Sequence, residues 1–201
     1  MPVRPDAYQG RYLRHKERKA QGIAQDGRPP TERNPERRSV RVFASTPVPR
    51  HILNAIFAGA RQAPQSCNRQ AITLRIFDCV ASMNNISALE RLLAGGSGWL
   101  GRAPVVVLLF ADMAAYKSPA EVAFMPWLDA GVMMATLVGA AHELGVATCI
   151  VNPHVRPELE LDFRAGFNHE GRLFCGAVAI GYPAITPAAP EKKPLEELVE
   201  W

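Results

Sequence analysis

An arginine cluster stands where the apolar part of the chain begins. In the run Arg37-Arg38-Ser39-Val40-Arg41, residues Arg37, Ser39 and Arg41 alternate, so in an extended chain their side chains point the same way. Guanidinium groups offer paired donors that match phosphate oxygens, and a serine hydroxyl can add another. The pattern predicts a phosphate clamp, although a solvated charged patch has the same composition.

A second polar segment follows at Ala63 to Gln70. It carries Gln65, Ser66, Asn68 and Gln70 between an apolar helical pattern and a strand pattern. Asparagine and glutamine both donate and accept hydrogen bonds, as recognition of the edge of a heterocycle requires. Simple turn chemistry is the competing interpretation.

A third segment joins a long apolar run to a short one. Leu144 to Thr148 contains Gly145, which suits the left-handed end of a helix and the close approach of a ligand. Cys149 to Pro153 follows as the end of a buried strand. By itself this is also an ordinary link from a helix to a strand.

Helices and strands alternate around these segments. Apolar residues at helical spacing predict a helix after Pro49, which is well placed as a first helical residue. Further helices are predicted at 86–93 and 127–144, and strands at 72–77, 105–110, 148–151 and 177–180, the last one stopped by Gly181-Tyr182-Pro183. This mixture predicts a layered α+β or α/β domain.

The predicted helix from Trp127 to Leu144 lacks a polar face over most of its length. Small residues recur along it, including Gly131, Ala135 and Gly139. Such a helix must be covered on all sides, by a sheet on one side and by another helix or subunit on the other. A large dimer interface is one way to cover it.

Charge is distributed unevenly along the 201 residues, which have a formal net charge of +4. Residues 1 to 41 hold 11 Lys and Arg against 5 Asp and Glu, whereas the remainder holds 12 against 14. We therefore expect a polar, basic arm at 1–34, with a short helix at Tyr8 to Gln21, followed by one domain at 35–201. The arm could contact nucleic acid, but it has little aromatic interleaving and no recognisable nucleic-acid fold follows, so no such partner is expected.

Compartment signals are simple. The N-terminus has no apolar core typical of a secretory signal, and the apolar run from Ala130 to His142 is shorter than the roughly 20 residues of a membrane span. The cytoplasm is the expected location, with no membrane contact.

Four isolated cysteines, at 67, 79, 149 and 175, form no CxxC pair and are expected to be buried reduced thiols. No metal site is expected. We name no catalytic acid or nucleophile, and interpret Cys67 as a structural thiol.

The order of the motifs resembles the FMN-dependent nitroreductase family, whose superfamily includes iodotyrosine deiodinase. The motifs are RRSVR, the segment AP-x-S-x-N-x-Q, LGVAT, GYP and the terminal KKPLEELV, and the resemblance extends from Arg37 to the C-terminus. It implies an α+β three-layer sandwich, with a mixed central sheet flanked by helices, and an obligate homodimer with FMN at the interface.

The resemblance also implies roles for individual residues. Arg37, Arg38, Ser39 and Arg41 would hold the FMN phosphate and ribityl chain. The loop residues Gln65, Ser66, Asn68 and Gln70 are candidate flavin contacts, with Asn68 and Gln70 approaching from the partner subunit. Ile150, Val151 and Asn152 would lie along the isoalloxazine near N5, and Lys192 and its neighbour Lys193 would reach the phosphate.

Several residues depart from the family pattern. Gln65 stands where the family usually has serine, and Ala71 rather than an aromatic residue follows Gln70. Prolines 29, 30 and 35 occupy the place of a helix that normally leads into the arginine run. Ser39 stands where the branch that fragments flavin has aspartate, so that chemistry is not expected.

The implied activity is an FMN-dependent oxidoreductase. It would pass electrons from NAD(P)H to an electron-poor small molecule, such as a nitroaromatic or a quinone, by a ping-pong mechanism. One alternative is a specialised enzyme on the same scaffold, a dehalogenase or a biosynthetic redox enzyme, whose choice of substrate would be set between Gly95 and Pro126, with Tyr116 and Lys117 as candidate lid residues. A flavin-binding protein without enzymatic activity is another.

Overall fold

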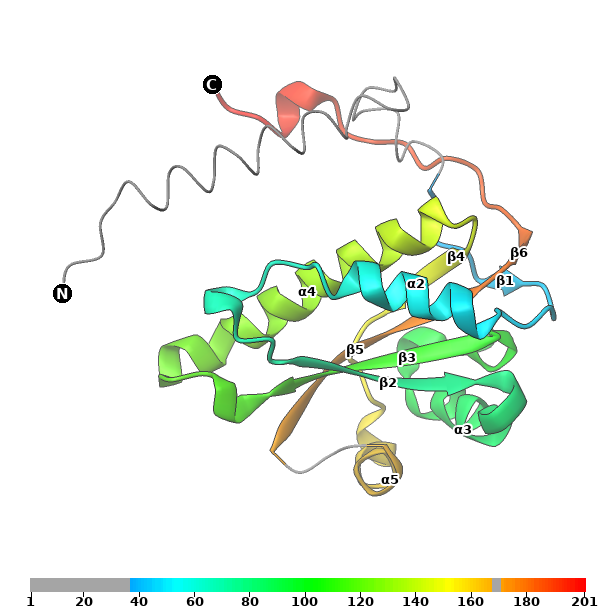
Figure 1. The fold of residues 1–201 in the computed structure, drawn as a ribbon, viewed down its shortest axis with the longest axis horizontal. Coiled ribbons are helices and arrows are strands. Elements are labelled where there is room, and N and C mark those ends of the chain that lie inside the picture. Colours follow the sequence, from blue (N-terminus) through cyan, green and yellow to red (C-terminus); the bar gives the residue numbers. More distant parts are fainter. Residues whose placement is uncertain (1–36, 168–170) are drawn as a thin grey trace. The chain divides into compact units, whose positions relative to one another are not determined.

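The computed structural model describes residues 37–167 and 171–201 (Figure 1). The predicted arm at 1–34 and its helix at Tyr8 to Gln21 lie outside the described residues. The central sheet consists of β2 (Ile72–Asp78), β3 (Val105–Asp112), β5 (Arg172–Gly181) and β4 (Ala147–Val151), which are neighbours in that order. Each predicted strand is therefore present, and each extends beyond its predicted range, β5 by the most.

Helices cover both faces of this sheet (Figure 1). On one face lie α2 (Arg50–Ala60) and α4 (Pro119–Glu143), and on the other α3 (Cys79–Leu92) and α5 (Glu160–Gly166). Short 3₁₀ turns complete the connections, at Ser66–Asn68, Ala94–Gly96, Leu100–Arg102, Met113–Ala115, Pro157–Leu159 and Leu195–Glu197.

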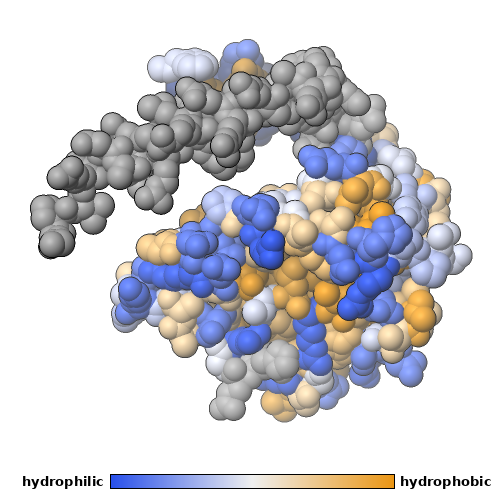
Figure 2. All heavy atoms as spheres, viewed as in Figure 1, coloured by the Kyte–Doolittle hydropathy of each residue, from blue (hydrophilic) through white to orange (hydrophobic). Residues whose placement is uncertain are grey.

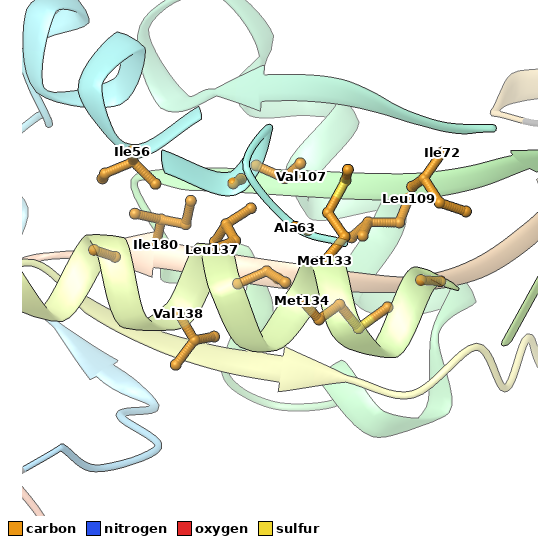
Figure 3. Close-up of a cluster of buried hydrophobic side chains, with 14 of the residues drawn as sticks. Ile56, Ala63, Ile72, Val107, Leu109, Met133, Met134, Leu137, Val138 and Ile180 are labelled. Carbon is orange, nitrogen blue, oxygen red and sulfur yellow. The ribbon is translucent and has the colours of Figure 1, made fainter. Parts of the chain in front are cut away.

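The two faces have separate hydrophobic cores because side chains of a strand alternate. Val105, Val107 and Leu109 of β3 join the core beneath α2 and α4, which also holds Ile56 and Leu137 (Figure 3). The intervening Val106, Leu108 and Phe110 join the core beneath α3 and α5. β3 is thus buried on both sides, as its uninterrupted apolar run predicts, and the three-layer arrangement is confirmed.

The α+β class is confirmed, but the central sheet is not mixed. All three pairings within it are antiparallel. Within the described residues, parallel pairing is confined to an isolated bridge between Ser39 and Thr148. The predicted stop at Gly181-Tyr182-Pro183 is confirmed, because β5 ends at Gly181. After it, β6 (Pro183–Ile185), which was not predicted, pairs with β1 (Val42–Phe43) in a small second sheet.

Helix α4 begins earlier than predicted and ends where predicted. The Ser118 hydroxyl caps its first turn by accepting from the N–H of Glu121. At the other end Gly145 has φ +70°, and the Val146 N–H donates to the Ala141 carbonyl, which closes the helix with a left-handed residue. At 25 residues the helix is long and apolar enough to cross a membrane by length and composition alone. Its buried face packs on the sheet, as the core helix of a soluble protein does.

Among residues 37–167 and 171–201, cover for α4 comes from one side. Ala130, Met133, Met134 and Leu137 are buried against the sheet and α2. On the opposite side Phe124, Trp127 and Leu128 are exposed at 55%, 43% and 55%, and Gly131 and Ala135 continue the exposed row. In the same view as Figure 1, Figure 2 shows apolar surface between polar groups. We use the name α4 stripe for the exposed row of Phe124, Trp127, Leu128, Gly131 and Ala135.

Candidate functional site

The arginine cluster forms an extended segment alongside β4. The Val40 N–H donates to the Thr148 carbonyl at 3.0 Å, and Ser39 forms the parallel bridge to the same residue. Val40 is 2% exposed, whereas Ser39 and Arg41 are exposed and Arg37 is half-buried. The expected alternation is therefore present, with one apolar side chain directed into the core and the polar ones outward.

Two of the guanidinium groups act on the same buried thiol. Burial raises the pKa of Cys149, and the positive charges of Arg41 and Arg37 oppose that rise in pKa. Arg41 also lies over the Trp99 ring, 5.8 Å from its centroid, a cation–π arrangement that orients the guanidinium. Arg37 and Arg41 thus place positive charge beside the same part of β4.

Part of this cluster lines a groove of about 460 Å³. Its lining includes Arg37, Arg38, His142 and Thr148, together with Thr186 of the segment that follows β6. Ser39 and Arg41 are not among its lining residues, so the groove takes only two of the four residues of the predicted clamp. The donor groups around the groove suit an anion with several oxygens.

The end of β4 continues from this cluster. Ile150 is 47% exposed and Asn152 is exposed, while Val151 between them is buried, so Val151 can offer only its backbone to a ligand. The Asn152 Oδ1 accepts from the His154 N–H at 3.2 Å. A Cβ placed on Gly95 would lie 3.2 Å from the Asn152 Oδ1, so a glycine there allows the turn after α3 to pack closely on this edge.

The loop that follows α2 has an unusual backbone. Cys67, Asn68 and Gln70 have φ values of 50°, 51° and 52°. Left-handed backbone costs roughly 1–2 kcal/mol for a residue with a Cβ, although asparagine adopts it more readily than most. Strain of this kind persists where the surroundings hold it and is often found at ligand sites. The loop is therefore held in one defined, strained conformation, which its sequence alone did not indicate.

Contacts from α4 hold this loop in place. The Ser66 N–H donates to Asp129 Oδ1 at 2.9 Å, and Arg69 forms an ion pair with Glu121 at 2.8 Å. The hydrogen bond between them raises the pKa of the guanidinium and lowers that of the carboxyl group. The Gln65 Oε1 is buried without a hydrogen-bond partner in the described part of the chain, which leaves one acceptor beside the loop for a donor from outside.

Tyr116, one of the two candidate lid residues of the alternative specialised enzyme, is instead a core residue. It is 6% exposed and its O–H donates to Asp129 Oδ2 at 3.0 Å. Burial, and then that hydrogen bond, raise its pKa. Our prediction overlooked Asp129, Arg69 and Glu121. The available signal was Asp129 itself, a charged residue inside an apolar helical pattern.

The cysteines are free thiols that do not share one environment. Cys149 and Cys175 are buried, and burial raises the pKa of Cys175 to about 11. Cys67 is exposed and Cys79 is half-buried, so the expectation of four buried thiols was wrong for two of them. In residues 37–167 and 171–201, no three His, Cys, Asp or Glu side chains gather as a metal site would require.

We expect Cys67→Gly to raise the free energy of unfolding by about 1 kcal/mol. Glycine adopts φ 50° without the penalty that a Cβ incurs, and this gain exceeds the entropy that glycine adds to the unfolded chain. Because the Cys67 side chain is exposed, little packing is lost. Chemical denaturation monitored by circular dichroism measures the change. Cys67→Ala keeps the Cβ and should show no gain, and an equal gain in both variants would refute the explanation from strain.

Within a single chain, the arginine cluster and the loop of Gln65 to Gln70 lie far from each other. Ser66 contacts Asp129 of α4, whereas Arg37 and Arg38 line the groove with His142 of the same helix. Thirteen residues of helix separate those two positions, which is about 20 Å at 1.5 Å per residue. The structure therefore brings the arginine cluster to β4 but leaves the loop of Gln65 to Gln70 near the other half of α4.

The C-terminal lysines lie on an exposed segment. Residues 183–198 are exposed, and Lys193 pairs with Glu197 of its own segment at 3.6 Å. Lys192 is exposed beside it. A role of either lysine in binding a phosphate stays a prediction.

The chain is similar to known proteins both in sequence and in fold. The sequence matches the Nitroreductase family over residues 35–86 and 80–182. An FMN reductase [NAD(P)H] of Bacillus subtilis (strain 168) is 29% identical over 127 residues, which are 56% of this chain and 49% of that protein. The chain thus spans about half the length of this curated relative.

Two solved structures illustrate the similarity of fold. A nitroreductase family protein of Streptococcus pneumoniae TIGR4 superposes with a TM-score of 0.74 at 16% identity, covering 85% of this chain and 98% of that one. An FMN-dependent nitroreductase of Clostridium difficile R20291 has a TM-score of 0.69 at 21% identity, covering 80% of this chain and 91% of that one. At these identities the structural matches establish the fold alone.

Proposed function

The chain belongs to the nitroreductase family, and we propose that it is an FMN-dependent oxidoreductase which takes electrons from NAD(P)H. The acceptor in this proposal is an electron-poor small molecule such as a nitroaromatic or a quinone, and the two half-reactions alternate in a ping-pong scheme. The relatives from Bacillus subtilis and Clostridium difficile, an FMN reductase [NAD(P)H] and an FMN-dependent nitroreductase, support the choice of cofactor and donor.

The observation that carries the proposal is the continuity of the arginine cluster with β4. Ser39 is bridged to Thr148, two residues before Ile150 and four before Asn152. A cationic surface for a phosphate thus adjoins an exposed strand edge that could lie along a flat ring system. These features fit FMN, whose phosphate and isoalloxazine lie at opposite ends of one ribityl chain.

In this proposal each group of residues has one task. Arg37, Arg38, Ser39 and Arg41 bind the phosphate and the ribityl chain, and Ile150, Val151 and Asn152 offer mainly backbone groups to the ring. When bound, FMN would supply the redox chemistry by accepting hydride from the reduced nicotinamide and giving the electrons to the acceptor. Positive charge beside the site would stabilise negative charge that develops on the ring. No side-chain acid or nucleophile is required.

The proposed enzyme is a homodimer, and the argument rests on α4. Two antiparallel α4 helices that cross at Ala135 and Thr136 would place Asp129 of one chain opposite His142 of the other, because the crossing point is midway between those residues. The loop of Gln65 to Gln70, which is bound to Asp129, would then approach the arginine groove of the partner. The α4 stripe would be covered by the same contact. The proposed location of this dimer is the cytoplasm.

Two measurements test the proposed function. We expect the purified protein to be yellow or to take up added FMN, and to oxidise NADH or NADPH in the presence of a nitroaromatic or a quinone. Initial rates measured at several concentrations of both substrates should give the parallel double-reciprocal lines of a ping-pong mechanism. A colourless protein that takes up no FMN would overturn the proposal. Uptake of FMN without nicotinamide oxidation would favour the specialised enzyme or the flavin-binding protein.

A further inference from the structure

Asp129 is a buried carboxylate on the apolar helix α4. It is 2% exposed, with the apolar Ala130 and Met133 of the same helix buried beside it. Both of its oxygens accept hydrogen bonds from outside the helix: Oδ1 from the Ser66 N–H at 2.9 Å and Oδ2 from the Tyr116 O–H at 3.0 Å. A buried carboxylate is costly unless it is hydrogen-bonded, so these two contacts account for its presence in an otherwise apolar setting.

The first contact anchors the loop immediately before its left-handed residues. Ser66 precedes Cys67 and Asn68, and Gln70 completes the strained set. Arg69 anchors the loop a second time, since its Nη1 donates to Ser66 Oγ at 3.1 Å and its Nη2 donates to Glu121 at 2.8 Å. The exposed side chains of Asn68 and Gln70 are thus presented by a backbone that α4 holds at two positions.

The hydrogen bond from Tyr116 to Asp129 links this carboxylate to the segment before α4. Tyr116 lies beneath Arg69, whose guanidinium carbon is 5.8 Å from the ring centroid. The Lys117 N–H donates to Glu121 Oε2 at 2.8 Å. The two carboxylates that hold the loop therefore also hold residues 116 and 117, so the loop and this segment are fixed by one network.

We infer that Asp129 is a positioning residue for FMN binding: through Ser66 and Tyr116 it sets the shape of the loop that presents Asn68 and Gln70. This inference rests on the proposed function, because it takes Asn68 and Gln70 to approach the flavin of the partner subunit, as the family resemblance implies. Asp129 itself touches neither the cofactor nor a substrate. Its effect is to keep the loop in a strained conformation that the loop sequence would not adopt unaided.

Asp129→Ala and Asp129→Asn test this role. Alanine removes both acceptors, whereas the asparagine carbonyl can accept from Ser66 and its amide can donate to the Tyr116 oxygen. In FMN-free protein, hydrogen–deuterium exchange of the Ser66 to Gln70 amides should be faster in Asp129→Ala than in wild type. FMN titration monitored by flavin fluorescence should give a dissociation constant about tenfold higher. Asp129→Asn should remain near wild type in both, and its bound flavin should keep the wild-type absorption spectrum.

Other variants keep the test decisive. Asp162→Ala removes an exposed aspartate on α5 and should leave exchange and FMN affinity unchanged. If Asp129→Ala does not fold, Tyr116→Phe removes only one of the two hydrogen bonds and should accelerate loop exchange by a smaller factor. Wild-type loop exchange and FMN affinity in a folded Asp129→Ala, or in Tyr116→Phe where alanine does not fold, would overturn the positioning role alone. A wild-type protein that takes up no FMN would overturn the proposed function and this role with it.

Discussion

Replacing Arg37 and Arg41 together with alanine should raise the dissociation constant of FMN by about 100-fold or more while the protein stays folded. Hydrogen bonds to a charged group contribute about 1.5–3 kcal/mol each, so the loss of two contacts to a phosphate is of that order. The fold should persist because Arg41 is exposed, Arg37 is half-buried, and the Val40 backbone bond to Thr148 is untouched. FMN titration measures the affinity, and circular dichroism and thermal unfolding check the fold.

Two further variants separate geometry from charge. Arg91→Ala with Arg164→Ala removes the same net charge from exposed positions on α3 and α5, and FMN affinity should stay within about twofold of wild type, since exposed charges away from the site contribute little. Arg37→Lys with Arg41→Lys keeps the charge but loses the paired donors, so an intermediate affinity is expected. Wild-type affinity in the double alanine variant would refute the assignment of the phosphate clamp.

The four strands of the central sheet could be predicted from the sequence because each is buried on at least one face. Val105 to Phe110 is an uninterrupted apolar run, and the structure places its alternate residues in the two separate cores. Its short length, its β-branched valines and the preceding Pro104 favour a buried strand over a buried helix. The end of α4 was predictable for a similarly local reason, since Gly145 adopts the left-handed conformation that closes a helix.

The starts of the helices were harder to predict because their first turns are mixed in character. We placed the start of the helix near Trp127, whereas α4 begins at Pro119 and continues through Pro126. A proline usually marks the end of a helix, and here it obscured the signal of Ser118 with Glu121 three residues later, which is the pattern of a capping box. Helix α3 likewise begins at Cys79, before a polar stretch with non-helical backbone at Ser82.

The candidate site was predictable only where its residues are neighbours in sequence. Arg37, Ser39 and Arg41 could be grouped by alternation alone. The contact that anchors the loop of Gln65 to Gln70 could not be predicted in this way. Ser66 and Asp129 are 63 positions apart, and their contact depends on how α2 packs on α4. The position of Trp99 beside Arg41 is likewise a result of tertiary packing.

A single charge on the α4 stripe should abolish both the dimer and the flavin site. We expect Ala135→Arg to elute as a monomer, to bind FMN about 100-fold more weakly and to lose nicotinamide oxidation. Ala135 is exposed within one chain and arginine is a good helix former, so the monomer fold should be retained. At a helix crossing between Gly131 and Gly139, however, a long charged side chain would prevent close approach and would be buried without a partner.

The control places the same substitution on the other side of the molecule. Ala165→Arg lies at an exposed position of α5, on the opposite face of the sheet from α4, and it should remain dimeric and active. Analytical ultracentrifugation gives the oligomeric state, and FMN titration of the same samples gives the affinity. A dimeric Ala135→Arg would show that the interface lies elsewhere. A monomeric Ala135→Arg with full FMN affinity would show that one chain completes the site, and the loop of Gln65 to Gln70 would then have no role across the interface.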